Sequence, residues 1–66
     1  MIYYIRIQAL HRNSFRQYVN DKEIDYEEIS FDLVNNTIMY CAEMDSAEAI
    51  TLKLSFPVTG ILVSGR

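Results

Sequence analysis

Cysteine, histidine and glycine are scarce in this chain of 66 residues, and each scarcity excludes a class of site. Cys41 and His11 are the only residues of their kinds, so no disulfide can form within the chain. A zinc site normally needs about four such ligands. Catalysis by a histidine with a nucleophile would depend on residues that nothing in the sequence brings together. Two glycines are too few for a phosphate-binding loop. We therefore expect no enzymatic activity, no metal and no cofactor.

Long apolar runs and export signals are also missing. No stretch approaches the roughly 20 apolar residues that cross a bilayer. The first residues, MIYYIRIQAL, have no basic segment before them and no small-residue cleavage site after them, which is unlike a signal peptide. A single free cysteine is typical of a reducing compartment. With no linker-like segment in residues 1–66, the sequence predicts one small cytoplasmic domain, with no membrane among its partners.

Acidic residues are absent from both ends of the chain. Residues 1–20 carry three arginines and residues 49–66 carry Lys53 and Arg66, with no acid in either segment. All nine acids lie in residues 21–48, where Lys22 is the only base, although the net charge of the whole chain is only −3. Such asymmetry bears on partners and association rates rather than on the fold.

The N-terminal part predicts a strand followed by a helix. Residues 2–10 alternate, with Tyr3, Ile5 and Ile7 on one face, which is typical of a half-buried strand. Apolar residues at helical spacing then predict a short helix over residues 14–20, capped by Asn13 or Ser14.

The segment ISFDLVNNTIMYCA predicts a hairpin with Asn35 and Asn36 as a two-residue turn, because asparagine tolerates the positive φ of such turns. In this register Val34 faces Thr37 and Glu28 faces Glu43. The face that becomes apolar consists of Ile29, Phe31, Leu33, Ile38, Tyr40 and Ala42.

Residues 49–56 are ambiguous. A capping box formed by Asp45 and Glu48 favours a helix, but the apolar residues then lie on two opposite sides. Strict alternation favours a strand, which we predict after one helical turn at 45–49, with the helix as the alternative. The segment PVTG is expected to turn the chain into a last strand, Ile61–Ser64.

Together these elements predict an α+β fold that is mostly β. We expect a small antiparallel sheet or partly open barrel of about five strands, with one short helix across one face. A chain of this length buries only about 60% of its unfolded surface, so its stability is marginal. With 50% apolar residues, part of the surface is expected to be covered by a second copy or by a partner.

The acidic run DKEIDYEE suggests a binding surface. In extended form, Glu23, Asp25 and Glu27 would line one edge at a repeat of about 6.6 Å, which resembles the spacing of roughly 6–7 Å between phosphates of a nucleic acid strand. Our leading hypothesis is an inhibitor or regulator that docks into a basic, nucleic-acid-binding groove of another protein, with Tyr26 as an anchor. The alternative is a solvated loop that keeps the chain soluble. The predicted contact residues are Asp21, Glu23, Asp25, Tyr26, Glu27, Glu28, Asp32, Glu43, Asp45 and Glu48.

Two further hypotheses remain open. Arg6, Arg12 and Arg16 could bind a nucleotide in a sequestering homo-oligomer, or could pair with the protein's own acids. The protein could also be an assembly subunit, such as a homodimer driven by apolar surface. Direct binding of nucleic acid is not expected, because the net charge has the wrong sign.

In general character the chain resembles the small acidic proteins that phages encode to disable host enzymes or defence systems. These include nucleic-acid mimics such as uracil-DNA glycosylase inhibitors and anti-CRISPR proteins. The resemblance rests on the small size and on DKEIDYEE with the later acids Asp32, Glu43, Asp45 and Glu48. It implies a host protein as target and the host cytoplasm as location, and no diagnostic motif transfers a residue role.

Overall fold

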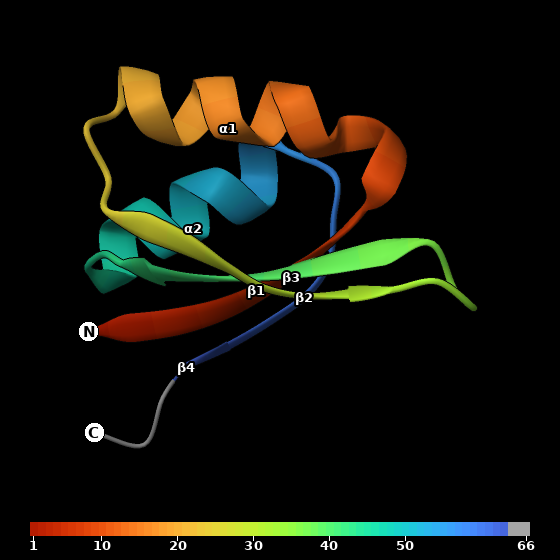
Figure 1. Cartoon of the computed structure of the whole chain (residues 1–66). Helices are drawn as coiled ribbons and strands as arrows, with labels where there is room; N and C mark the ends of the chain where they lie inside the picture. The colour runs from red at the N-terminus through yellow and green to blue at the C-terminus, as the bar shows by residue number, and fades with distance from the viewer. Residues whose placement is uncertain (64–66) are drawn as a thin grey trace.

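The computed structural model describes residues 1–63 as a four-stranded antiparallel sheet with two helices on one face (Figure 1). The elements follow in the order β1 (Ile2–Gln8), a 3-10 turn (Ala9–His11), α1 (Arg12–Asp21), β2 (Tyr26–Asp32), β3 (Thr37–Glu43), α2 (Ser46–Ser55) and β4 (Val58–Val63). The expected antiparallel α+β fold with more strand than helix is confirmed. Within these residues there are four strands and two helices instead of the predicted five and one.

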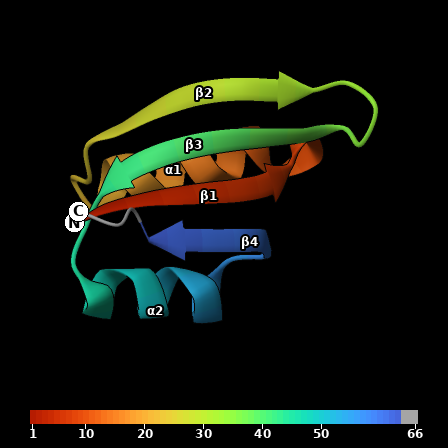
Figure 2. The ribbon, with the colours of Figure 1, turned by 90° about the horizontal axis from the view of Figure 1, so that it is seen from below.

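The strand order β2-β3-β1-β4 interleaves two crossovers. Strands β1 and β2, which α1 connects, are not neighbours in the sheet, because β3 lies between them. Strands β3 and β4, which α2 connects, are likewise separated by β1 (Figure 2). This is the split β-α-β arrangement, also called ferredoxin-like. Widely used folds of this kind carry many unrelated functions, so function has to be argued from the surfaces.

The core lies between the sheet and the helices. The predicted inward face of β1 is confirmed, since Ile5 and Ile7 are fully buried and Tyr3 packs against the core. Phe15 of α1 stacks on Tyr40 of β3 with ring centroids 4.4 Å apart. The fully or almost fully buried side chains are Ile5, Ile7, Phe15, Val19, Ile24, Ile38, Tyr40, Ala42, Met44, Ala49 and Leu52.

Residues 46–55 form a helix, so the predicted strand there is wrong and the helical alternative is confirmed. The capping box decides the outcome. The Asp45 carboxylate accepts the Glu48 N–H at 2.7 Å, and the Asp45 N–H donates to the Glu48 carboxylate at 2.9 Å. Two backbone N–H groups that have no partner within the helix thereby gain hydrogen bonds. The strand pattern misled because it included Leu54, which is 82% exposed.

The hairpin forms, but its predicted register is wrong. The Asp32 carboxylate accepts the backbone N–H of Val34 at 3.0 Å and of Asn35 at 3.2 Å, and the Asn35 amide at 2.9 Å. This side-chain turn ends β2 at Asp32, which pairs with Thr37 and leaves four connecting residues, 33–36. Asn36 takes the positive φ of 55°.

A bulge between Glu28 and Ser30 shifts the register further, so Glu28 faces Tyr40 and not Glu43. On the predicted apolar face, Ile38, Tyr40 and Ala42 are buried as expected. The β2 side of that face is not buried as predicted. Phe31 pairs with Ile38 and keeps to the predicted face, but it lies on the edge strand, whereas Ile29 lies at the bulge and Leu33 lies in the turn. Ile29, Phe31 and Leu33 are 50%, 41% and 85% exposed.

The remaining boundaries differ in smaller ways. Helix α1 begins at Arg12, and its N-cap is His11 without a side-chain hydrogen bond, so Asn13 and Ser14 lie inside the helix and do not cap it. Residues 58–60, predicted as a turn, already belong to β4. The predicted end of this strand, Ser64, lies outside the described residues. No helix within residues 1–63 is long and apolar enough to cross a membrane.

Candidate partner-binding surfaces

The fold gathers two separate acidic segments at one end of the molecule. Helix α1 and strand β3 end there, and strand β2 and helix α2 begin there, beside the N-terminus (Figures 1 and 2). We call this region the acidic end. Its acidic residues are Asp21, Glu23, Asp25, Glu27, Glu43, Asp45 and Glu48.

Three of these carboxylates have partners within the protein. Glu43 binds the N-terminal ammonium at 2.8 Å, and Asp45 and Glu48 cap α2. The others form no ion pair within residues 1–63 and are exposed to solvent. These four, which we call the unpaired acids, are Asp21, Glu23, Asp25 and Glu27.

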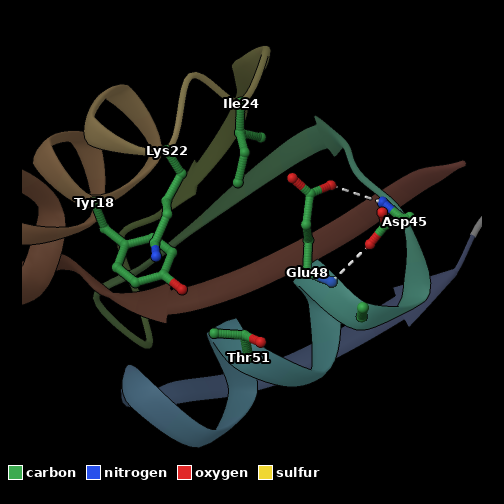
Figure 3. Close-up of a pocket in the computed structure, with 7 residues that line it drawn as sticks. Tyr18, Lys22, Ile24, Asp45, Glu48 and Thr51 are labelled. Atoms are coloured by element: carbon green, nitrogen blue, oxygen red, sulfur yellow. Dashed lines mark hydrogen bonds between the residues drawn. The ribbon is translucent and has the colours of Figure 1, made fainter.

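A shallow hollow of about 300 Å³ opens at the acidic end between the two helices. Figure 3 shows Tyr18 of α1 and Lys22, which directly follows α1, on one side, and Glu48 and Thr51 of α2 on the other. The Lys22 ammonium lies 5.7 Å from the centre of the Tyr18 ring. A second hollow of about 300 Å³ borders the first residues of β2. The acidic end is therefore an uneven surface with aromatic and carboxylate groups.

Two acids of the predicted surface lie elsewhere, and Tyr26 lies at the acidic end but is only partly exposed. Asp32 is in the turn at the opposite end of the hairpin, where hydrogen bonds from Asn35 lower the pKa of its carboxyl. Glu28 points to the helix side and binds Arg12 at 3.0 Å. Tyr26 is only partly exposed, because its ring packs edge-on against Phe15 with centroids 6.3 Å apart. Tyr26 therefore packs against the edge of the hydrophobic core.

The predicted row of acids at the spacing of nucleic acid phosphates does not form. Glu23 has a φ of 57° and lies in a turn, and β2 begins only at Tyr26. The backbone from Glu23 to Glu27 is therefore not one extended strand, and the regular repeat of the acids is lost. What the structure retains is a local concentration of negative charge.

The three arginines do not form one site. Arg12 and Arg16 lie on α1, whereas Arg6 pairs with Met39 and Gly60 on the sheet face that the helices leave open. The Tyr26 hydroxyl interacts with Arg16 and raises the pKa of its guanidinium. Within one copy of the chain the three arginines therefore do not form the predicted nucleotide site, because the sheet separates Arg6 from the other two.

The open face of the sheet has an apolar centre that the sequence analysis did not single out. Tyr4 and Arg6 of β1, Met39 of β3 and Leu62 of β4 surround a hollow of about 390 Å³. The hollow extends over Gly60, where an added Cβ would meet no atom within 4 Å. The alternation in residues 2–10 already placed Tyr4 and Arg6 on this face, but the strand order was needed to see what joins them.

The Tyr40 hydroxyl is a buried polar group without a hydrogen-bond partner in residues 1–63. Burial and the nearby Glu28 carboxylate raise the pKa of this phenol. A buried hydroxyl that makes no bond carries a desolvation cost of about 1–3 kcal/mol.

We expect the substitution Tyr40→Phe to stabilise the protein by about 1 kcal/mol, because it removes the unpaired hydroxyl and keeps the stacked ring. For a domain of this size the melting temperature should rise by about 4–8 °C. Calorimetry measures the shift. The control is Tyr4→Phe, on the exposed side of β1, whose melting temperature should equal that of the unmodified protein. A lower melting temperature for Tyr40→Phe would show that the hydroxyl has a bonding partner.

No cluster of three or more metal-ligating side chains occurs in the described part of the chain. The chain matches no known protein family, no curated protein and no solved structure.

Proposed function

We propose that this protein is an inhibitor or regulator that docks its acidic end onto a cationic, nucleic-acid-binding groove of another protein. The observation that supports this most directly is the convergence of the unpaired acids with Glu43, Asp45 and Glu48 on one end of a small domain. Charge of one sign concentrated on one surface accelerates association with a surface of opposite sign and selects against other partners.

Two of the unpaired acids lie at positions that the fold disfavours. Asp21 is the last residue of α1, which has no basic residue in its last turn. The partial negative charge at a helix C-terminus disfavours an acid there by a few tenths of a kcal/mol up to about 1 kcal/mol. Glu23 follows in a left-handed conformation that most side chains disfavour. Acids at positions where the fold disfavours them point to a partner.

A role in solubility alone accounts less well for the distribution of charge. Acids that only keep a protein soluble can be spread over its surface, with both signs interspersed. Here Arg6 lies on the open sheet face and Arg12 and Arg16 lie on α1, whereas seven of the nine acids lie at one end. The protein is therefore electrically polarised along its length, which orients it during an encounter.

The test compares two variants with the same net charge. The first neutralises the acidic end with Glu23→Gln, Asp25→Asn and Glu27→Gln. The second leaves the acidic end intact and adds three cations at exposed positions, with Gln8→Lys, Gln17→Lys and Ser55→Lys. Each raises the net charge of −3 by three units. A difference between them therefore reports where the charge lies.

Each immobilised protein is incubated with a bacterial lysate, washed with salt steps from about 50 mM to 500 mM, and the retained proteins are identified by mass. We expect the unmodified protein and the lysine variant to retain the same nucleic-acid-handling protein at low salt and to release it at high salt or with excess duplex DNA. The neutralised variant should not retain it. Equal retention by the neutralised variant, or loss from both variants, would refute docking through the acidic end.

A further inference from the structure

The two edge strands of the sheet, β2 and β4, differ in the features that protect them from pairing with another chain. Strand β2 carries Glu27, Glu28 and Asp32 and is bulged between Glu28 and Ser30, and such features protect an edge from pairing with another chain. Strand β4 has the sequence VTGILV, without a charged residue or a proline. No strand in residues 1–63 pairs with its outer side. Strand β4 also has a bulge, at Thr59, where it pairs with Arg6 and Ile7 of β1. It differs from β2 in that no charged side chain of its own protects its edge.

Helix α2 runs along the β4 edge. Figure 2 shows α2 beside β4, on the outer side of the sheet. A hollow of about 290 Å³ lies between them, and its walls include Tyr3, Ile50, Lys53, Ile61 and Val63. Ile50 and Val63 remain 59% and 51% exposed, although both are apolar. The edge is therefore one wall of a groove with apolar sides and a single cation, Lys53.

We infer that the groove between α2 and β4 binds an extended segment of a partner protein, which pairs with β4 as a fifth strand. In an edge strand, alternate backbone N–H and C=O groups point outward and are free to bond to an added strand. Alternate side chains of that segment would enter the hollow between Ile50 and Val63, and an acidic side chain would meet Lys53. The groove reaches the acidic end at Ser46, and none of the four unpaired acids lines it.

Charge favours a partner segment over a second copy of this chain. A two-fold pairing of β4 with β4 would bring the two α2 helices and their Lys53 side chains toward each other. Residues 49–66 contain no acid to balance them. Like charges placed together without a counter-charge disfavour such a pairing. An acidic and apolar peptide segment supplies the missing negative charge.

The probe is a displayed library of random linear peptides, selected on the immobilised protein. We expect enrichment of peptides in which apolar residues alternate and one Asp or Glu recurs at a fixed position. A synthetic peptide from this selection should slow amide hydrogen exchange in residues 60–63. The exposed substitution Lys53→Glu should weaken its binding about tenfold, and a new selection on that variant should enrich Lys or Arg at the same position.

Two controls separate this mode from others. A peptide pairs through only one of its edges, so N-methylation of alternate residues should abolish binding in one set and leave it unchanged in the other. The neutralised acidic-end variant should bind the peptide as well as the unmodified protein does. If no alternating acidic peptides are selected, or if the selected peptides respond to the acidic end and not to Lys53, the inference fails. A dimer in sedimentation that protects β4 from exchange would assign the edge to a second copy and would also overturn it.

Discussion

Replacing Leu52 by alanine is expected to remove a large part of the protein's stability, whereas replacing Leu54 should leave it nearly unchanged. Leu52 is fully buried and Leu54 is 82% exposed. A buried leucine reduced to alanine costs about 2–5 kcal/mol. At about 0.05–0.15 kcal/mol per residue, a chain of this length has a total stability of only about 3–10 kcal/mol. Exposed substitutions usually change stability by less than about 0.5 kcal/mol.

This pair of substitutions distinguishes the two interpretations of residues 46–55. In a strand, Leu52 and Leu54 would share one face, and replacing either by alanine would lower the free energy of unfolding by a similar amount. In a helix, positions two apart point in different directions, so only one of them can face the core. Denaturation by urea, followed by circular dichroism, measures both free energies of unfolding. Similar losses for the two variants would contradict the helix.

Phe15→Ala is expected to have the largest effect of any single substitution, a loss of about 3–5 kcal/mol. Phe15 is fully buried and stacks on Tyr40, and its ring also meets Phe56 edge-on with centroids 5.7 Å apart. Given the total of about 3–10 kcal/mol, the variant should be partly or wholly unfolded at room temperature. Dispersion of the amide resonances in an NMR spectrum reports this directly.

The matched control is Phe31→Ala. Phe31 lies in β2 beside the bulge and is 41% exposed, so much less of its ring leaves water on folding. Its loss should therefore be clearly smaller than that of Phe15. The hairpin register predicted from the sequence would instead place Phe31 opposite Tyr40, in the core. A loss for Phe31→Ala equal to that for Phe15→Ala would favour that register and contradict the observed one.

The elements that could be predicted from sequence are those whose residues interact locally. Alternation in β1 and β3 identified the buried faces correctly, because a one-residue slip would expose a whole apolar face. The turn was misplaced because two asparagines signalled it, whereas the Asp32 side chain ends the strand earlier by bonding backbone N–H groups. Helix α2 was missed because apolar residues on both its sides hid the helical period.

The candidate surfaces depended more on topology. The concentration of acids in residues 21–48 was visible in the sequence, but their meeting at one end follows from α1 ending beside the start of α2. The separation of Arg6 from Arg12 follows from the alternation of side chains along β1. The groove beside β4 could not be anticipated, because an edge exists only once the order of the strands is known.

The central position of β1 has a consequence for how the protein folds. Tyr3 pairs with Ala42 on one side and with Val63 on the other, 39 and 60 positions further along the chain. Pairing over such distances closes large loops, and topologies of this kind fold slowly. Strand β1 therefore completes its pairing only after β4 has been synthesised, and a chain that stops before Val58 would leave β1 as an open edge strand. We therefore expect stable folding to need the chain at least through β4.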